Sequence, residues 1–139
     1  IEERQRLAAR YDQAFAELGC LQTPAKLAQY EHGYQSYACL FQPERAKAAA
    51  ARRSTSEIKA INEARNVWMD KLYLLGVSTR PATHAVHMLS FYHQKYGLQP
   101  EDFLNAFVAN DCSISLPLFH GMTEAEQDFV IETVTKAQF

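Results

Sequence analysis

Residues 113–126 read Ser-Ile-Ser-Leu-Pro-Leu-Phe-His-Gly-Met-Thr-Glu-Ala-Glu, and this stretch decides the fold class. Its first half alternates three apolar side chains with two serines: Ile114, Leu116 and Leu118 against Ser113 and Ser115. The alternation predicts a half-buried β-strand over residues 113–119, and Pro117 marks an edge or an end because proline cannot donate to a sheet ladder. Thr123 and Glu126 then have the spacing of a capping box, which predicts the start of a helix.

Helices and strands also alternate through the rest of the chain. Apolar periodicity predicts helices over 7–18 and 58–75, each followed by a glycine that can end it, Gly19 or Gly76. A partly irregular helix over 83–96 and a helix that begins at Pro100 follow. Short strands are predicted at 21–24, 34–41 and 77–80. Residues 1–139 are therefore predicted to form one α/β domain, an α+β sandwich.

Residues 44–56 are predicted to be an exposed helical turn or an exposed insertion. They are rich in alanine and carry four basic residues: Arg45, Lys47, Arg52 and Arg53. We interpret this basic cluster as a solvated face rather than a binding patch.

Composition narrows the class of protein. The 139 residues are 47% hydrophobic and 22% charged, as in one globular domain. Fourteen basic and sixteen acidic residues give a net charge of −2, so the chain lacks the positive field expected of a protein that grips nucleic acid or an anionic membrane. No apolar run approaches the roughly 18 residues of a membrane-spanning helix. The three cysteines form no CxxC pair, and their odd number argues against a disulfide framework, so a cytoplasmic location is expected.

Familiar catalytic motifs are absent from the sequence, which has no GxSxG turn and no glycine-rich phosphate loop. His84 and His87 lie three residues apart, but no third ligand converges with them, so a metal site is not expected. Polar chemistry gathers in residues 76–87, Gly-Val-Ser-Thr-Arg-Pro-Ala-Thr-His-Ala-Val-His, where Arg80 could bind a phosphate or a carboxylate. Arg80 could equally pair with a nearby acid, and His87 could be a core histidine.

A series of motifs then resembles a known family. In chain order they are Arg-Gln-Arg-Leu-Ala-Ala-Arg-Tyr at 4–11, Arg-Asn-Val-Trp-Met-Asp-Lys-Leu at 65–72, Gly-Val-Ser-Thr-Arg at 76–80, His87, Ser-Leu-Pro-Leu-Phe at 115–119 and Met-Thr-Glu at 122–124. From end to end the chain resembles the C-terminal portion of the DegT/DnrJ/EryC1/StrS family of sugar aminotransferases.

This resemblance implies the small domain of a fold-type-I enzyme that uses pyridoxal 5′-phosphate (PLP), with helices packed on a small, mostly antiparallel sheet. The parent protein would be a homodimer that moves an amino group from an amino acid, usually glutamate, to a nucleotide-linked keto sugar. In the family, the N-terminal large domain holds PLP and the lysine that forms its Schiff base. None of the six lysines here matches that motif, so the resemblance assigns this chain no catalytic and no cofactor-binding residue, and the chain alone should be inactive.

The resemblance also implies which residues face the substrate. Arg80 would bind a phosphate or a sugar hydroxyl, His87 would be a hydrogen-bonding wall residue, and His84 lies between them. Many members carry a His-Tyr pair where this chain has Ala82-Thr83, and a histidine where it has Gln35, which leaves the sugar specificity open. Two other functions stay open, a PLP-dependent sugar dehydratase of the same family and a non-catalytic sugar-nucleotide-binding or regulatory module.

Overall fold

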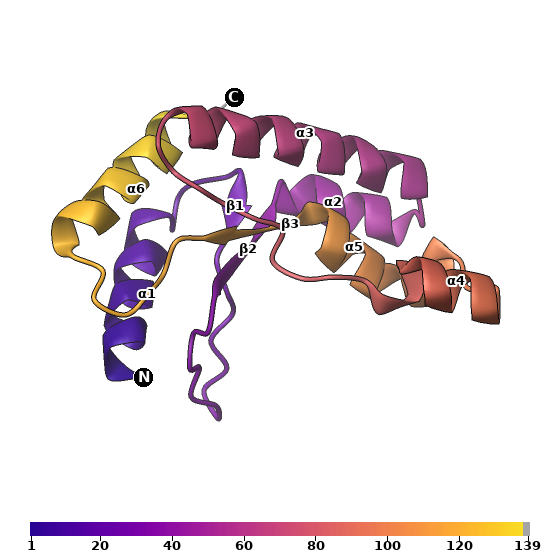
Figure 1. Cartoon of the computed structure of the whole chain (residues 1–139), viewed down its shortest axis with the longest axis horizontal. Coiled ribbons are helices and arrows are strands. Elements are labelled where there is room, and N and C mark those ends of the chain that lie inside the picture. The colour runs from indigo at the N-terminus through magenta and orange to yellow at the C-terminus, as the bar shows by residue number, and fades with distance from the viewer. Residues whose placement is uncertain (138–139) are drawn as a thin grey trace.

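The computed structural model describes residues 1–137, which form six α-helices and a small antiparallel sheet. The elements, in order, are α1 (Glu2–Ala14), β1 (Leu21–Gln22), β2 (Tyr37–Phe41), α2 (Pro43–Ala51), α3 (Thr55–Leu74), the 3₁₀ turn η1 (Val86–Met88), α4 (Ser90–Tyr96), the 3₁₀ turn η2 (Pro100–Phe103), α5 (Leu104–Cys112), β3 (Ser113–Leu116) and α6 (Glu124–Lys136). Figure 1 shows α1 and α6 at one end of the molecule, α4 at the other and α3 lying along one side. The predicted α+β fold with an antiparallel sheet is confirmed.

The sheet has the strand order β1-β2-β3, and both pairings are antiparallel. Leu21 pairs with Phe41, and Cys39 pairs with Ile114. Beyond β3, Arg80 forms a single bridge to Ser115. The strand predicted at 77–80 is therefore wrong in extent. Only Arg80 pairs with β3, whereas the Val77 N–H donates to the Leu72 carbonyl at 2.9 Å and so belongs to the end of α3.

β3 is buried on both faces, whereas the alternation predicted a half-buried strand. Ser113 and Ser115 are only 8% and 5% exposed. Ser113 lies beside the buried Arg65 of α3, which donates to its carbonyl at 3.0 Å. Ser115 lies beside Arg80 in the bridge. The backbone at both serines is thus paired with two other segments of the chain, and those segments lie where the prediction placed water.

The ends of the helices differ in how well local sequence specifies them. The capping box of α6 is confirmed, since the Thr123 hydroxyl accepts from the Glu126 N–H at 3.2 Å and the Glu126 carboxylate accepts from the Thr123 N–H at 2.8 Å. In contrast, α1 ends at Ala14 rather than near Gly19, and a turn carries Phe15 and Leu18 into the core. Apolar side chains therefore continue inward after the helix has ended.

The expectation that residues 44–56 are an exposed segment is wrong for one face of α2. Ala46 and Ala49 have no solvent exposure, and α2 packs on α3 and α5. Their methyl groups let the helices approach closely, so an alanine-rich sequence here marks a helix contact. The basic side chains remain at the surface, where Lys47 pairs with Glu44 at 3.2 Å.

All three cysteines are free thiols, and they differ in how far they are buried, so we expect them to differ in reactivity. Cys39 and Cys112 are buried, whereas Cys20 is half-buried. Burial raises the pKa of Cys39 to about 12 and that of Cys112 to about 11, and it also raises the pKa of Cys20. A raised pKa keeps the thiol neutral, and only the thiolate reacts with alkylating agents.

We therefore expect iodoacetamide at pH 8 to modify Cys20 first, with Cys39 modified only when the chain unfolds. Peptide mass spectrometry over a time course measures the order. Labelling of Cys39 as fast as that of Cys20 in the native chain would contradict this description of the core.

Candidate functional site

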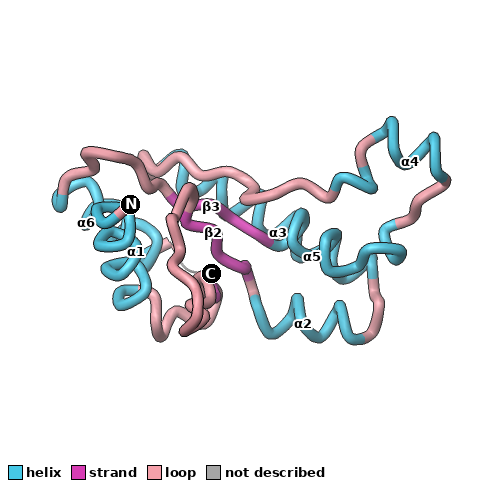
Figure 2. Tube along the Cα trace, turned by 90° about the horizontal axis from the view of Figure 1, so that it is seen from below, coloured by secondary structure: helices cyan, strands magenta, loops and turns pink. Residues whose placement is uncertain are grey.

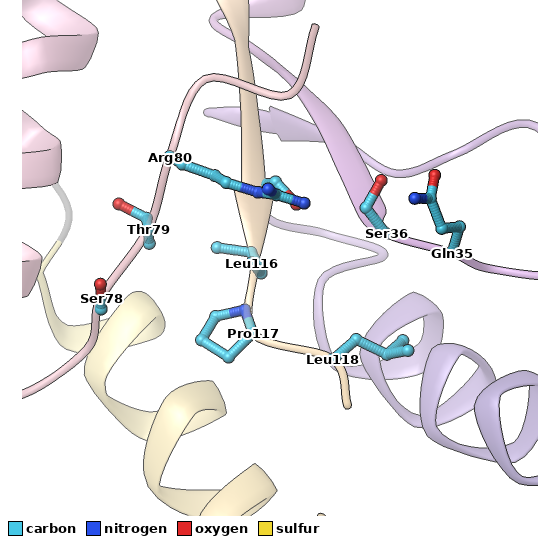
Figure 3. Close-up of a pocket in the computed structure, with 9 residues that line it drawn as sticks. Gln35, Ser36, Ser78, Thr79, Arg80, Leu116, Pro117 and Leu118 are labelled. Atoms are coloured by element: carbon cyan, nitrogen blue, oxygen red, sulfur yellow. The ribbon is translucent and has the colours of Figure 1, made fainter. Parts of the chain in front are cut away.

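Arg80 lies in an open pocket of about 220 Å³ where three segments of the chain meet. Nine residues line the pocket: Gln35 and Ser36 before β2, Ser78, Thr79 and Arg80 after α3, and Ser115, Leu116, Pro117 and Leu118 from β3 and its continuation. In Figure 3 the side chain of Arg80 points across β3 toward Ser36. The pocket thus joins the predicted residue Arg80 to residues far away in the sequence.

The backbone of Arg80 is held in place while its guanidinium stays accessible. Its carbonyl accepts from the Ser115 N–H at 2.7 Å, and its own N–H donates to the Ser115 carbonyl at 3.4 Å. The side chain is exposed, and no acid lies among the lining residues. Within residues 1–137, no carboxylate forms an ion pair with this guanidinium. The alternative that Arg80 pairs with a nearby acid is therefore wrong for the part of the chain that the structure describes.

The chemistry of this pocket suits an anionic ligand that carries hydroxyl groups. Six of its nine lining residues are polar: the arginine, one glutamine, one threonine and three serines. A guanidinium donates a forked pair of hydrogen bonds to a phosphate or carboxylate. Serine and threonine hydroxyls and a glutamine amide can each donate or accept, as recognition of a sugar hydroxyl requires.

His84 and His87 lie in a second pocket, of about 370 Å³, and not in the pocket of Arg80. The other residues that line it are mostly apolar: Val86, Tyr92, Leu98, Phe103 and Ala106. The segment between α3 and α4 bridges to β3 at Arg80 and then runs to the end of the molecule where α4 lies (Figure 2). The structure thus divides the three predicted site residues between a polar pocket and an apolar one.

His87 itself is 6% exposed, and its ring lies 5.2 Å from that of Phe103. This burial resembles that of a core histidine. Its Nε2, however, is buried without a hydrogen-bond partner among the residues described. Buried polar atoms are nearly always paired, so this nitrogen is a place where a group from outside residues 1–137 could bond. His84 is exposed at the rim.

Sequence reasoning did not connect Ser36 and Ser115 with the site around Arg80. Ser78 and Thr79 belonged to the segment already singled out, and Gln35 was noted only as a departure from the family. The serine in Ser-Leu-Pro-Leu-Phe was the available signal, because Ser115 is a polar residue inside an apolar strand and faces the pocket from β3.

Two of the lysines, Lys26 and Lys95, are engaged with other side chains of the chain. Lys26 lies in a pocket, but its ammonium pairs with Asp12 at 2.6 Å, and that hydrogen bond raises its pKa. A lysine that attacks a carbonyl must be neutral, whereas the raised pKa of Lys26 keeps its amine protonated. Lys95 lies over the rings of Phe91 and Tyr96. The described residues likewise contain no cluster of three or more histidine, cysteine or acidic side chains that could hold a metal ion.

Comparison with known proteins shows what this arrangement belongs to. A model of the DegT/DnrJ/EryC1/StrS aminotransferase family matches residues 1–135. The chain belongs to this family. Spore coat polysaccharide biosynthesis protein SpsC of Bacillus subtilis (strain 168) is 27% identical over 133 residues, which is 96% of this chain and 31% of SpsC. The resemblance drawn from the sequence motifs is thus confirmed.

Solved structures of aminotransferases share the fold. The PLP form of Spr1654 from Streptococcus pneumoniae has a TM-score of 0.75 at 20% identity, over 99% of this chain and 32% of that one. PseC of Helicobacter pylori, an aminotransferase involved in the biosynthesis of pseudoaminic acid, has a TM-score of 0.73 at 15% identity, over 98% of this chain and 32% of that one. The chain spans about a third of the length of these relatives.

Among residues 1–137, no helix is both long and apolar enough to span a membrane.

Proposed function

We propose that the full-length protein containing this chain is a PLP-dependent sugar aminotransferase, which moves an amino group from an amino acid, glutamate in the simplest case, to a nucleotide-linked keto sugar. This chain would form the wall of the substrate cleft that binds the acceptor. A large domain would hold PLP and supply the lysine that binds it. This domain would correspond to the part of the relatives that lies outside the matched third. A cytoplasmic homodimer is part of the same proposal.

The observation that carries the proposal is the Arg80 pocket in a chain of this family. Its single cation has no acidic partner in the lining, and the surrounding hydroxyl and amide groups match a ligand that joins a phosphate to a sugar. The guanidinium would bind the phosphate and neutralise part of its charge. Ser36, Ser78 and Gln35 would then orient the sugar through its hydroxyls.

The histidines would act differently from Arg80. His87 lies in the apolar pocket with one nitrogen unpaired, so it would donate or accept one hydrogen bond at the wall of the cleft. His84, exposed at the rim, would contact the ligand only near solvent. Neither residue would take part in bond breaking.

Replacing Arg80 by alanine in the full-length protein is expected to weaken binding of the sugar nucleotide about 10- to 150-fold. A hydrogen-bonded charge pair of this kind contributes roughly 1.5–3 kcal/mol. His87→Ala should weaken it less, about 2- to 10-fold, because a neutral hydrogen bond contributes roughly 0.5–1.5 kcal/mol. Titration calorimetry with nucleotide-linked sugars measures both effects.

The matched control is Arg45→Ala, which removes an exposed arginine of α2 that does not line the pocket. It should leave sugar-nucleotide binding unchanged. A sharp fall in melting temperature of Arg80→Ala with unchanged affinity per folded molecule would show a structural role instead.

A further inference from the structure

The turn that carries His87 is held at its start by one side chain of α5. The buried N–H of Ala85, the residue before η1, donates to Oδ1 of Asn110 at 3.0 Å. The Ala85 carbonyl accepts from the Met88 N–H at 2.9 Å, which closes the turn around His87. A buried N–H without a partner is costly, so Asn110 selects the backbone position from which the turn begins.

The carboxamide of Asn110 is itself oriented by its neighbour. Its Nδ2 donates to Oδ1 of Asp111 at 2.6 Å, which leaves Oδ1 of Asn110 as the acceptor for Ala85. The Asp111 carbonyl in turn accepts from the side chain of Asn62 at 3.0 Å. Both residues at this end of α5 are thus fixed by hydrogen bonds from side chains.

Arg65 ties the same end of α5 to α3. It is 3% exposed, and its Nη1 donates to the carbonyl of Asn110 at 2.8 Å and to that of Ser113 at 3.0 Å. Burial lowers the pKa of this guanidinium, and the charge of Asp111 opposes that shift. The backbone that carries Asn110 therefore has little freedom to move.

We propose that Asn110 is a positioning residue for His87, which acts by holding the N–H of Ala85 and so fixing where the imidazole stands in its pocket. Contact of His87 with the sugar nucleotide rests on the proposed function. The hydrogen bond by which Asn110 holds the turn does not depend on the proposed function, so it can be tested separately.

Hydrogen exchange of the full-length protein tests the hold. Asn110→Ala should speed amide exchange in residues 85–89 about 5- to 150-fold, the range expected when a buried N–H loses its partner. The double variant Asn110→Asp with Asp111→Asn keeps an acceptor for Ala85, a hydrogen bond between the two side chains and the net charge, and should restore slow exchange. Asn105→Ala, an exposed change on the same helix, should leave exchange at 85–89 unchanged. Unchanged exchange in Asn110→Ala would overturn the proposal.

A double-mutant cycle on the sugar-nucleotide KM tests the consequence for the ligand. Asn110→Ala should raise this KM and leave the amino-donor KM unchanged, and it should have no further effect in the His87→Ala background. An equal rise in both backgrounds would overturn the proposal, because a general structural effect does not need His87. If His87→Ala leaves the sugar-nucleotide KM unchanged, the proposed contact of His87 with the ligand fails, whereas the exchange rates still decide whether Asn110 holds the turn.

Discussion

Replacing Trp68 by alanine is expected to destabilise the chain by about 3–5 kcal/mol. The indole has no solvent exposure and stacks on Phe41 with the ring centroids 5.3 Å apart. Its Nε1 donates to the carbonyl of Ala137 at 2.9 Å, so it also ties α3 to the end of α6. Alanine would leave a large cavity between α3 and the sheet, because the surrounding core relaxes only in part.

Urea unfolding followed by far-UV circular dichroism measures this loss. Fluorescence cannot serve, because Trp68 is the one tryptophan of the chain. Tyr73→Ala is the matched control, since Tyr73 lies on the same helix and is 69% exposed, and its effect should stay within about 0.5 kcal/mol. A loss below about 1 kcal/mol for Trp68→Ala would contradict the packing described here.

Replacing Arg65 by methionine is expected to destabilise the chain by about 2–4 kcal/mol. Methionine keeps much of the side-chain volume but removes the donor to the carbonyls of Asn110 and Ser113. The buried Ser113 carbonyl left unpaired costs about 1–3 kcal/mol, the partly buried Asn110 carbonyl adds to this cost, and relief of the buried charge offsets part of it.

Arg6→Met is the comparison for this change. Arg6 pairs with Glu124 at 3.3 Å, and both side chains are more than half exposed, so the change should cost about 1 kcal/mol or less. The same urea unfolding experiment measures both variants. If the two arginine substitutions lower the free energy of unfolding equally, the claim that the buried hydrogen bonds of Arg65 stabilise the chain would be contradicted.

The sequence predicted best those features that depend on neighbouring residues. The capping box of Thr123 and Glu126 needs only four consecutive residues, and the structure has it. The alternation of Ile114 and Leu116 specified a strand, but the burial of Ser115 depends on Arg80, which lies 35 positions earlier in the chain. The alanines of α2 were misinterpreted for the same reason, because only the approach of α3 makes a small side chain a core residue.

The candidate site shows the same limit. Arg80 could be singled out from a polar stretch of sequence, and Ser78 and Thr79 are its neighbours in the chain. The assignment of His87 to a different pocket could not be predicted, because it follows from the path taken after Pro81. Asn110 gave no signal, since its importance comes from a hydrogen bond across 25 positions to a backbone N–H.

The most direct test of the account is a spectroscopic transfer cycle with the full-length protein. We expect the purified protein to bind PLP, the visible absorbance of the bound PLP to fall when glutamate is added, and the absorbance to return when a nucleotide-linked keto sugar is added. The return should need about 10- to 150-fold more sugar nucleotide in Arg80→Ala, while the glutamate step stays unchanged. A full-length protein that binds no PLP, or one that releases a deoxygenated sugar without an amino group, would contradict the proposed sugar aminotransferase.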